Sequence, residues 1–266
     1  MKLIRPLITG LVVCSIALAM VTSLAAQTAQ QGIAKIVNIK GSARFMSVGS
    51  TAWQPLKIGT ILKAGTIVQT AADSFVDVVL NNADAYEAPL SPAMTTAASS
   101  GAGSYQPKAE QDAIRIYENT VLGVEKLTVN QTGADTVTET QLDLKHGKIF
   151  GTVKKLAAAS KYEVKIPNGV AGIRGTIYFI SADGILSVIS GSVVLAYIGS
   201  DSNPVTQVVT AGQQFDSRTG KLTAIPSSLL EQLRQVAMVF HRGPRMPSVL
   251  FPRDHNIENL SPNQPG

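Results

Sequence analysis

The stretch YEVKI at residues 162–166 alternates apolar and charged side chains, as a strand does when only one of its faces is buried. Downstream, apolar-rich runs at 177–181 and 185–189 are separated by Asp183-Gly184, a pair that favours a tight β-hairpin. A further run at 193–198 is equally apolar, and we expect it and 185–189 to be central strands. Such runs, rich in Val, Ile and Thr, recur along the chain and predict an all-β domain.

A three-residue unit also recurs, consisting of Gly, then a polar or small residue, then an aliphatic residue or Ala. Gly adopts backbone angles that are closed to other residues, so each unit indicates a sharp turn followed by a new strand. The spacing of the units is irregular, which argues against a strict solenoid and predicts a β-sandwich, roll or jelly-roll-like domain of many short strands. The units are GSA at 41–43, GTI at 59–61, GTI at 65–67, GKI at 147–149, GTI at 175–177 and GSV at 191–193.

Residues 1–26 are typical of a signal peptide for export. Lys2 and Arg5 precede a long apolar run, and small residues follow at 22–26. The run is close to the length that spans a bilayer, so an uncleaved anchor is the alternative interpretation. No second segment is long and apolar enough to cross a membrane, so we expect no membrane span once the signal is removed.

The remainder divides into a domain and a C-terminal region. We expect one all-β domain at 32–226, interrupted at 83–112 by a low-complexity surface insertion rich in Ala, Ser, Thr, Gly and Pro. In the region 227–266, Ser228 and Glu231 form a capping box ahead of an apolar stripe. This pattern predicts an amphipathic helix, residues 228–242, that caps a sheet edge or face. Pro residues then recur, so the tail is expected to be extended or disordered.

The composition argues against several classes of function. The net charge is +5, and the Lys and Arg residues are scattered, which argues against a nucleic-acid binder. One Cys, inside the apolar run, and three separated His residues give no disulfide framework, zinc site or cysteine nucleophile. No Gly-x-Ser-x-Gly elbow is present. We therefore expect no enzyme activity, no cofactor and no metal site.

Two side chains stand out as binding candidates. Trp53 is the only Trp and can stack on a sugar, although a single Trp is more typical of a packing anchor. Gly169, Gly172 and Gly175 are spaced by three around Arg174, but a β-rich run follows them instead of the helix that a phosphate loop requires. We interpret the segment as a compact turn in which Arg174 donates to backbone carbonyls of a neighbouring loop. Anion binding by its planar fork is the alternative.

The chain resembles the extracytoplasmic domain of the FecR (ferric-citrate regulator) family. In the first half the resemblance rests on VNIKGSA at 37–43 and on the Trp and spaced glycines of WQPLKIGTILKAGTIVQT at 53–70. In the second half it rests on LDLKHGKI at 142–149 and on YEVKIPNGVAGIRGTIYF at 162–179, whose Ile-Arg-Gly-Thr core is the most specific part. The similarity extends over residues 32–216, interrupted by the insertion.

The resemblance implies a non-catalytic β module that senses or binds a partner at the bacterial cell envelope, in the periplasm or at the cell surface. The partner is expected to be an unknown envelope protein or a cell-wall polymer. Only residues 1–6 precede the apolar run, so we expect a secreted variant that lacks the cytoplasmic anti-sigma domain. The motif residues, structural or partner-binding, are Trp53, Gly59, Gly65, Gly147, Gly172, Arg174, Gly175, Thr176 and Gly191.

Two other functions stay open at this point. One is a secreted structural or surface-assembly protein, in which the β domain pairs with copies of itself. The other is an envelope enzyme of unknown type, which would require acidic or His side chains that are distant in sequence to meet in one pocket.

Overall fold

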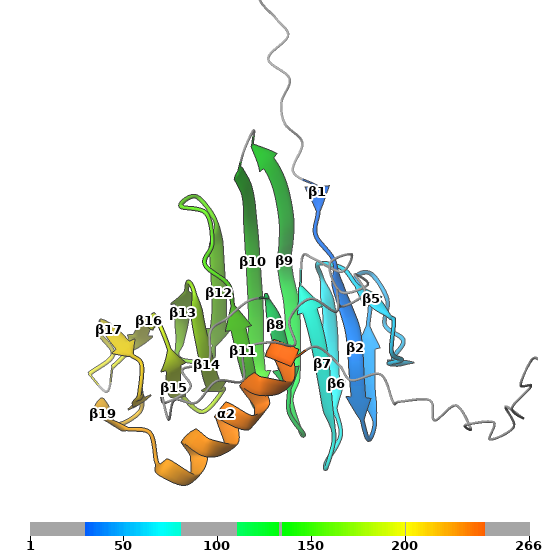
Figure 1. The fold of residues 1–266 in the computed structure, drawn as a ribbon. Coiled ribbons are helices and arrows are strands. Elements are labelled where there is room, and N and C mark those ends of the chain that lie inside the picture. The colour runs from blue at the N-terminus through cyan, green and yellow to red at the C-terminus, as the bar shows by residue number, and fades with distance from the viewer. Residues whose placement is uncertain (1–29, 81–110, 133–134, 200, 243–266) are drawn as a thin grey trace, which may run out of the picture.

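The structure, a computed structural model, describes residues 30–80, 111–132, 135–199 and 201–242 (Figure 1). The predicted signal peptide, nearly all of the predicted insertion and the Pro-rich tail lie outside these residues. In the described part, no helix combines the length and the apolar character that crossing a membrane would need.

Two large, mostly antiparallel sheets contain all of the described strands, which confirms the predicted all-β fold. The first, sheet A, runs in the order β17 (Pro204–Thr210), β16 (Ser192–Ile198), β13 (Gly169–Ile173), β12 (Lys161–Ile166), β10 (Asp135–His146), β9 (Val121–Thr132), β6 (Thr66–Thr70), β3 (Ala43–Met46) and β4 (Gln54–Pro55), with β1 (Gln30–Gln31) also paired to β9.

Sheet B has a matching order and lies face to face with sheet A. Its strands are β19 (Lys221–Ala224), β18 (Gln213–Asp216), β15 (Ile185–Ser190), β14 (Thr176–Ser181), β11 (Lys148–Val153), β8 (Ala113–Ile116), β7 (Phe75–Leu80), β2 (Ala34–Lys40) and β5 (Ile61–Leu62). Apolar side chains from the inner faces of both sheets form one continuous core. The molecule is therefore a β-sandwich.

The alternation at residues 162–166 is confirmed in β12. Tyr162, Val164 and Ile166 are buried in the core, whereas the charged residues between them lie on the outer face. The run at 185–189 is β15, an interior strand of sheet B, as predicted. The run at 193–198 lies in β16, which is also an interior strand because it pairs with β13 and β17, although alternate residues of it are exposed on the outer face of sheet A.

The chain passes between the sheets at corners, and most corners contain one residue with a positive φ. These residues are Gly41 (β2 to β3), Gly59 (β4 to β5), Gly65 (β5 to β6), Asp73 (β6 to β7), Asn119 (β8 to β9), Gly147 (β10 to β11), Gly175 (β13 to β14), Gly191 (β15 to β16) and Gly212 (β17 to β18). Every Gly of the recurring three-residue unit is thus the point at which the chain changes sheet. The unit is therefore not only a turn, because it also connects a strand of one sheet to a strand of the other.

Corners also pack against one another in pairs. In each pair, a corner Gly lies against a second corner, in which a residue with a positive φ is followed directly by Ser or Thr. The pairs are Gly41 with Asp73-Ser74, Gly147 with Asn119-Thr120, and Gly191 with Gly175-Thr176. The hydroxyl of the second corner forms a hydrogen bond with the backbone of the residue after the Gly. These bonds are Ser42 N to Ser74 Oγ (2.9 Å), Lys148 N to Thr120 Oγ1 (3.1 Å), and Thr176 Oγ1 to the Ser192 carbonyl (2.8 Å).

The predicted C-terminal helix is confirmed as α2 (Ser227–Arg242), which begins one residue earlier than expected. Leu233, Ala237 and Phe240 are buried against the outer face of sheet B. Phe240 stacks on Phe150 of β11, with ring centroids 6.0 Å apart. The helix therefore covers a sheet face, where it lies across the strands of sheet B (Figure 1).

An ion pair is buried next to this helix. Arg115 of β8 and Asp77 of β7 are register partners, and Arg115 Nε donates to Asp77 Oδ1 at 2.7 Å. The Arg115 guanidinium lies over the Phe75 ring at 4.2 Å from its centroid, and Phe240 of α2 lies 5.7 Å away. Because a buried charge is costly without its partner, this pair fixes how β7 and β8 meet beneath the helix.

The inner faces of the sheets meet at a tyrosine pair. The hydroxyls of Tyr162 and Tyr178 are 3.2 Å apart and both side chains are buried. Tyr178 lies opposite Gly151 of β11, where any Cβ would overlap its ring. Burial raises the pKa of both hydroxyls, so the folded protein holds these two protons more firmly than the unfolded chain does.

The corner contacts predict a graded loss of stability from two glycine substitutions. Gly147 and Gly212 have nearly equal φ values, 82° and 81°, so both Ala variants lose about 1–2 kcal/mol from backbone strain. A Cβ on Gly147 would also overlap Thr120 and meet the Asn119 carbonyl at 2.7 Å, whereas a Cβ on Gly212 meets nothing within 4 Å. We expect Gly147→Ala to lose roughly 1–3 kcal/mol more than Gly212→Ala in urea denaturation. Equal losses would contradict the packing role of the corner.

The tyrosine pair predicts both a mutational effect and a pH effect. Tyr178→Phe leaves the Tyr162 hydroxyl buried without its partner and should cost about 1–3 kcal/mol, whereas the double Phe variant should cost less than the sum of the single variants. The stability from the raised pKa values is complete below about pH 10, the pKa of an unfolded tyrosine, and is lost as the pH rises above it. Urea denaturation at pH 8 and pH 10.5 should show this decline in the natural chain and a smaller one in the double variant. An undiminished decline would refute the assignment.

Candidate binding surfaces

The Ile173-Arg174-Gly175-Thr176 motif forms the corner between β13 and β14. Gly175 has a φ of 65°, and the buried Thr176 hydroxyl lies within hydrogen-bonding distance of the Arg174 and Ser192 carbonyls. The exposed Arg174 donates from Nη2 to the Leu156 carbonyl at 3.0 Å, the kind of contact that the turn interpretation expects. A strand, β14, follows the motif. These contacts give the motif a structural role, and partner binding by Arg174 stays a prediction.

The motif residues do not converge on one site. Trp53, Gly59 and Gly65 lie at the β4–β5 end of the sandwich, whereas Arg174 and Gly191 lie nearer the β17–β19 end. Gly147 lies between them, at the corner from β10 to β11. Gly172, on β13, does not have a positive φ, and a Cβ there would meet only the Val194 carbonyl at 3.7 Å.

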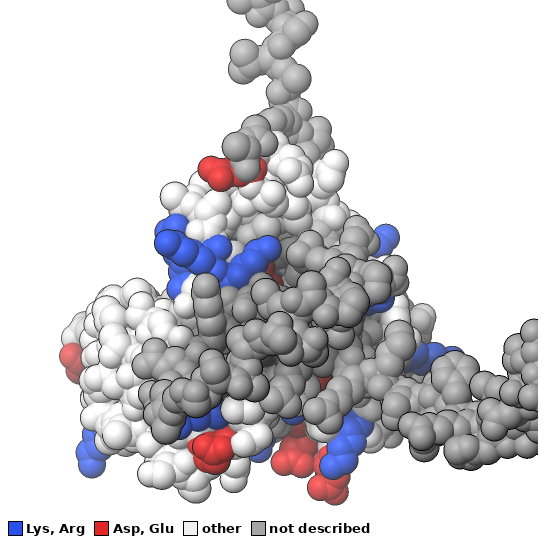
Figure 2. Space-filling view, in the orientation of Figure 1, with Lys and Arg blue, Asp and Glu red and all other residues white. Residues whose placement is uncertain are grey.

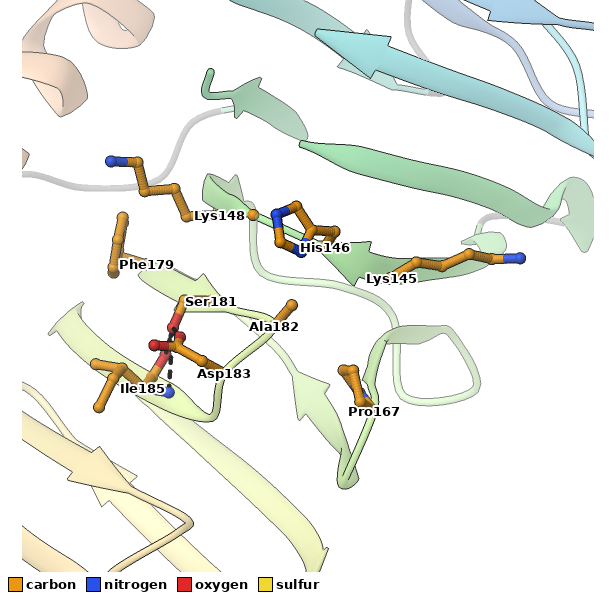
Figure 3. A pocket seen from close by; sticks show the side chains of 10 residues that line it. Lys145, His146, Lys148, Pro167, Phe179, Ser181, Ala182, Asp183 and Ile185 are labelled. Atoms are coloured by element: carbon orange, nitrogen blue, oxygen red, sulfur yellow. Dashed lines mark hydrogen bonds between the residues drawn. The ribbon is translucent and has the colours of Figure 1, made fainter. Parts of the chain in front are cut away.

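A hollow of about 600 Å³ lies beside the corner at Gly147 (Figure 3). His146 lines it, with Lys145 and Lys148 on either side pointing away from one another. Ser181 donates to Asp183 within the β14–β15 hairpin, so these two polar groups serve the turn. The hollow gathers no set of reactive groups that face one another across it.

A second hollow, also of about 600 Å³, lies at the β3–β4 edge of sheet A. Arg44 of β3 is central to it: its Nε donates to Gln69 Oε1 at 2.8 Å, and its guanidinium lies 4.5 Å from the centroid of the Trp53 ring. Trp53 keeps 38% of its surface exposed. Sequence reasoning identified Trp53 but missed Arg44 and Gln69, because only the register of β3 between β4 and β6 brings them together.

An uncharged surface lies at the opposite end of sheet A. We define the β16–β17 patch as six of the exposed side chains on the outer face of these strands, namely Val194, Ala196, Ile198, Pro204, Thr206 and Val208. Val194, Ile198 and Val208 are 47%, 51% and 50% exposed. Figure 2 views the sandwich from the opposite side, the one that carries α2, and on that side too the left-hand end of the molecule is largely uncharged surface.

The titratable groups with shifted pKa values serve the fold. Burial raises the pKa of Asp112, whose Oδ1 accepts a hydrogen bond from Lys154 N at 2.9 Å and so ties β11 to the start of β8. Over the described ranges, no group of three or more His, Cys, Asp or Glu side chains is arranged to hold a metal ion.

Comparison with known proteins finds a family that the middle of the chain resembles. Residues 107–194 match the FecR protein family, a region that runs through the described strands from β8 to the first part of β16. No curated protein matches.

Two crystal structures of a "putative anti-sigma factor" from Parabacteroides distasonis are similar at 13% identity and a TM-score of 0.32. The similarity covers 45% of this chain and about half, 53%, of the chain in each structure. Over residues 107–194, this chain is thus similar to the FecR protein family.

Proposed function

We propose that the chain is a non-catalytic, extracytoplasmic binding or sensing module of the bacterial cell envelope, and that it contacts a protein partner through the β16–β17 patch. The family match supports an envelope regulator, and the predicted signal peptide at 1–26 supports export. Both described hollows lack converging acidic or His groups, in keeping with a role in contact instead of catalysis.

The observation that carries this proposal is the contrast between two parts of one sheet face. On the outer face of β9, β10 and β12, opposite charges pair across strands: Lys126 with Glu139 at 2.7 Å, and Lys165 with Glu125 at 2.6 Å. These pairs are typical of a solvated sheet face. The neighbouring β16 and β17 contain no Lys, Arg, Asp or Glu at all.

An uncharged, apolar sheet surface next to an edge is a feature that soluble proteins usually avoid, because it promotes association. Val194 and Val208 are register partners, so their side chains form one raised apolar ridge. The backbone edge itself is partly occupied: Gln207 Nε2 donates to the Val208 carbonyl, and Thr210 N donates to Gln213 Oε1. We therefore assign the contact to the outward face of the patch instead of to the addition of a strand.

Site-specific photocrosslinking in the source cells tests this proposal. A photoreactive residue at Val208 should crosslink one dominant envelope protein, whereas the same residue at Lys126, on the charged part of the face, should not. Val194→Lys should abolish the Val208 product without lowering the melting temperature by more than a few degrees, since position 194 is exposed.

Two results would contradict the proposal. Crosslinking of the chain only to a second copy of itself would favour the surface-assembly function. Equal crosslinking from positions 208 and 126 would show that the uncharged patch is not the contact surface.

A further inference from the structure

The hollow at the β3–β4 edge has the composition of a small-molecule site. It lies at the other end of the sandwich from the β16–β17 patch, so binding there does not depend on the proposed function. Its volume of about 600 Å³ falls within the roughly 300–1,000 Å³ of typical ligand pockets. Its principal lining residues are Arg44, Trp53, Gln54, Pro55, Gln69 and Asn119.

The cation in this hollow is held in a fixed position. Arg44 lies between Pro55 of β4 and Gln69 of β6 in the register of sheet A. Its Nε is used by Gln69, and its planar group rests on the Trp53 ring. Within the described residues, its two Nη groups have no acceptor. A pre-oriented guanidinium with both terminal nitrogens available is suited to gripping a carboxylate with two parallel hydrogen bonds.

The neutral polar side chains that line the hollow also have groups without hydrogen-bond partners among the described residues. The side-chain amides of Gln54 and Asn119 make no hydrogen bond to any described residue, and Gln69 uses only its carbonyl oxygen, which leaves its amide nitrogen for a ligand. An apolar ligand would bury these amides without partners, at a cost in affinity. A phosphate-rich ligand would need several cations, and Arg44 is the only charged residue among those that line the hollow.

The indole supplies the remaining part of the site. Trp53 is partly exposed while one side of it supports Arg44, so it offers a flat apolar wall beside a ring of hydrogen-bonding groups. A ligand that matches all of these features has an apolar ring surface, several hydroxyls and one negative charge. We infer that the hollow binds an acidic saccharide, with the sugar ring against Trp53, the carboxylate on the Arg44 Nη groups and the hydroxyls on the amides.

The test uses the purified chain and two probes of the same ring configuration, trigalacturonate and the neutral galactotriose, in which hydroxymethyl groups replace the carboxylates at C6. Because Trp53 is the only Trp, a change in tryptophan fluorescence on titration reports directly on this site. We expect trigalacturonate to shift the emission and to bind at least about tenfold more tightly than galactotriose, the difference that one charge-assisted pair supplies.

Three variants assign the contacts by calorimetry. Arg44→Gln should reduce the affinity for trigalacturonate to that for galactotriose, Trp53→Ala should abolish binding of both, and Val208→Ser, at the far end of sheet A, should change neither. Circular dichroism checks that each variant is folded, and Trp53→Phe, which keeps an aromatic wall, should retain part of the affinity.

The inference is overturned if neither sugar binds at millimolar concentration, if Trp53→Ala binds as well as the natural chain, or if both sugars bind equally. An equally tight complex with a short polyglutamate peptide would also overturn it, because the site would then recognise charge alone. None of these results bears on the β16–β17 patch, so the two proposals fail separately.

Discussion

The structure depends on one repeated contact: a glycine at one corner of the sandwich lies directly against a Ser or Thr hydroxyl of the opposing corner. At Gly147, the backbone takes a left-handed conformation and leaves no room for a side chain, and the Thr120 hydroxyl accepts the next amide hydrogen. The contact does two things at once, since it turns the chain from one sheet into the other and satisfies the backbone at the turn. Similar contacts are present at Gly41 and Gly191, so this interaction between corners recurs along the sandwich.

With the corners fixed, the outer faces of the two sheets are free to differ. Sheet B is covered by α2, whose apolar stripe extends the core beyond the sandwich and buries the pair of Asp77 and Arg115. Sheet A carries no helix among the described residues, and its outer face changes from paired charges in the middle to bare aliphatic side chains at β16 and β17. Function is therefore expected on sheet A, where the fold leaves surface uncovered.

Local patterns in the sequence predicted much of this fold. Alternation identified β12, Asp183-Gly184 identified the hairpin between β14 and β15, and the apolar stripe identified α2. The recurring Gly units were interpreted correctly as turns, but their role as sheet crossings depends on which strands pair across the whole chain. The same limit applies at residues 193–198, since the apolar composition predicts an interior strand but does not show that its outer face is left exposed.

The candidate sites were harder to predict, because their residues come together only through the register in which the strands pair. Trp53 was visible as a single aromatic residue, but Arg44 and Gln69 join it only through the pairing of β3 with β4 and β6. The β16–β17 patch likewise exists because Val194 and Val208 face each other across two strands.

Native-state hydrogen exchange at the corners tests the central claim most directly. The Ser42 and Lys148 amides, which donate to hydroxyls of opposing corners, should exchange as slowly as the core strands, through global unfolding. The Ala52 amide, which also donates to a hydroxyl but in an exposed loop, should exchange much faster. If the two corner amides exchanged as fast as Ala52 while the strands stayed protected, the corners would not be what holds the sandwich together.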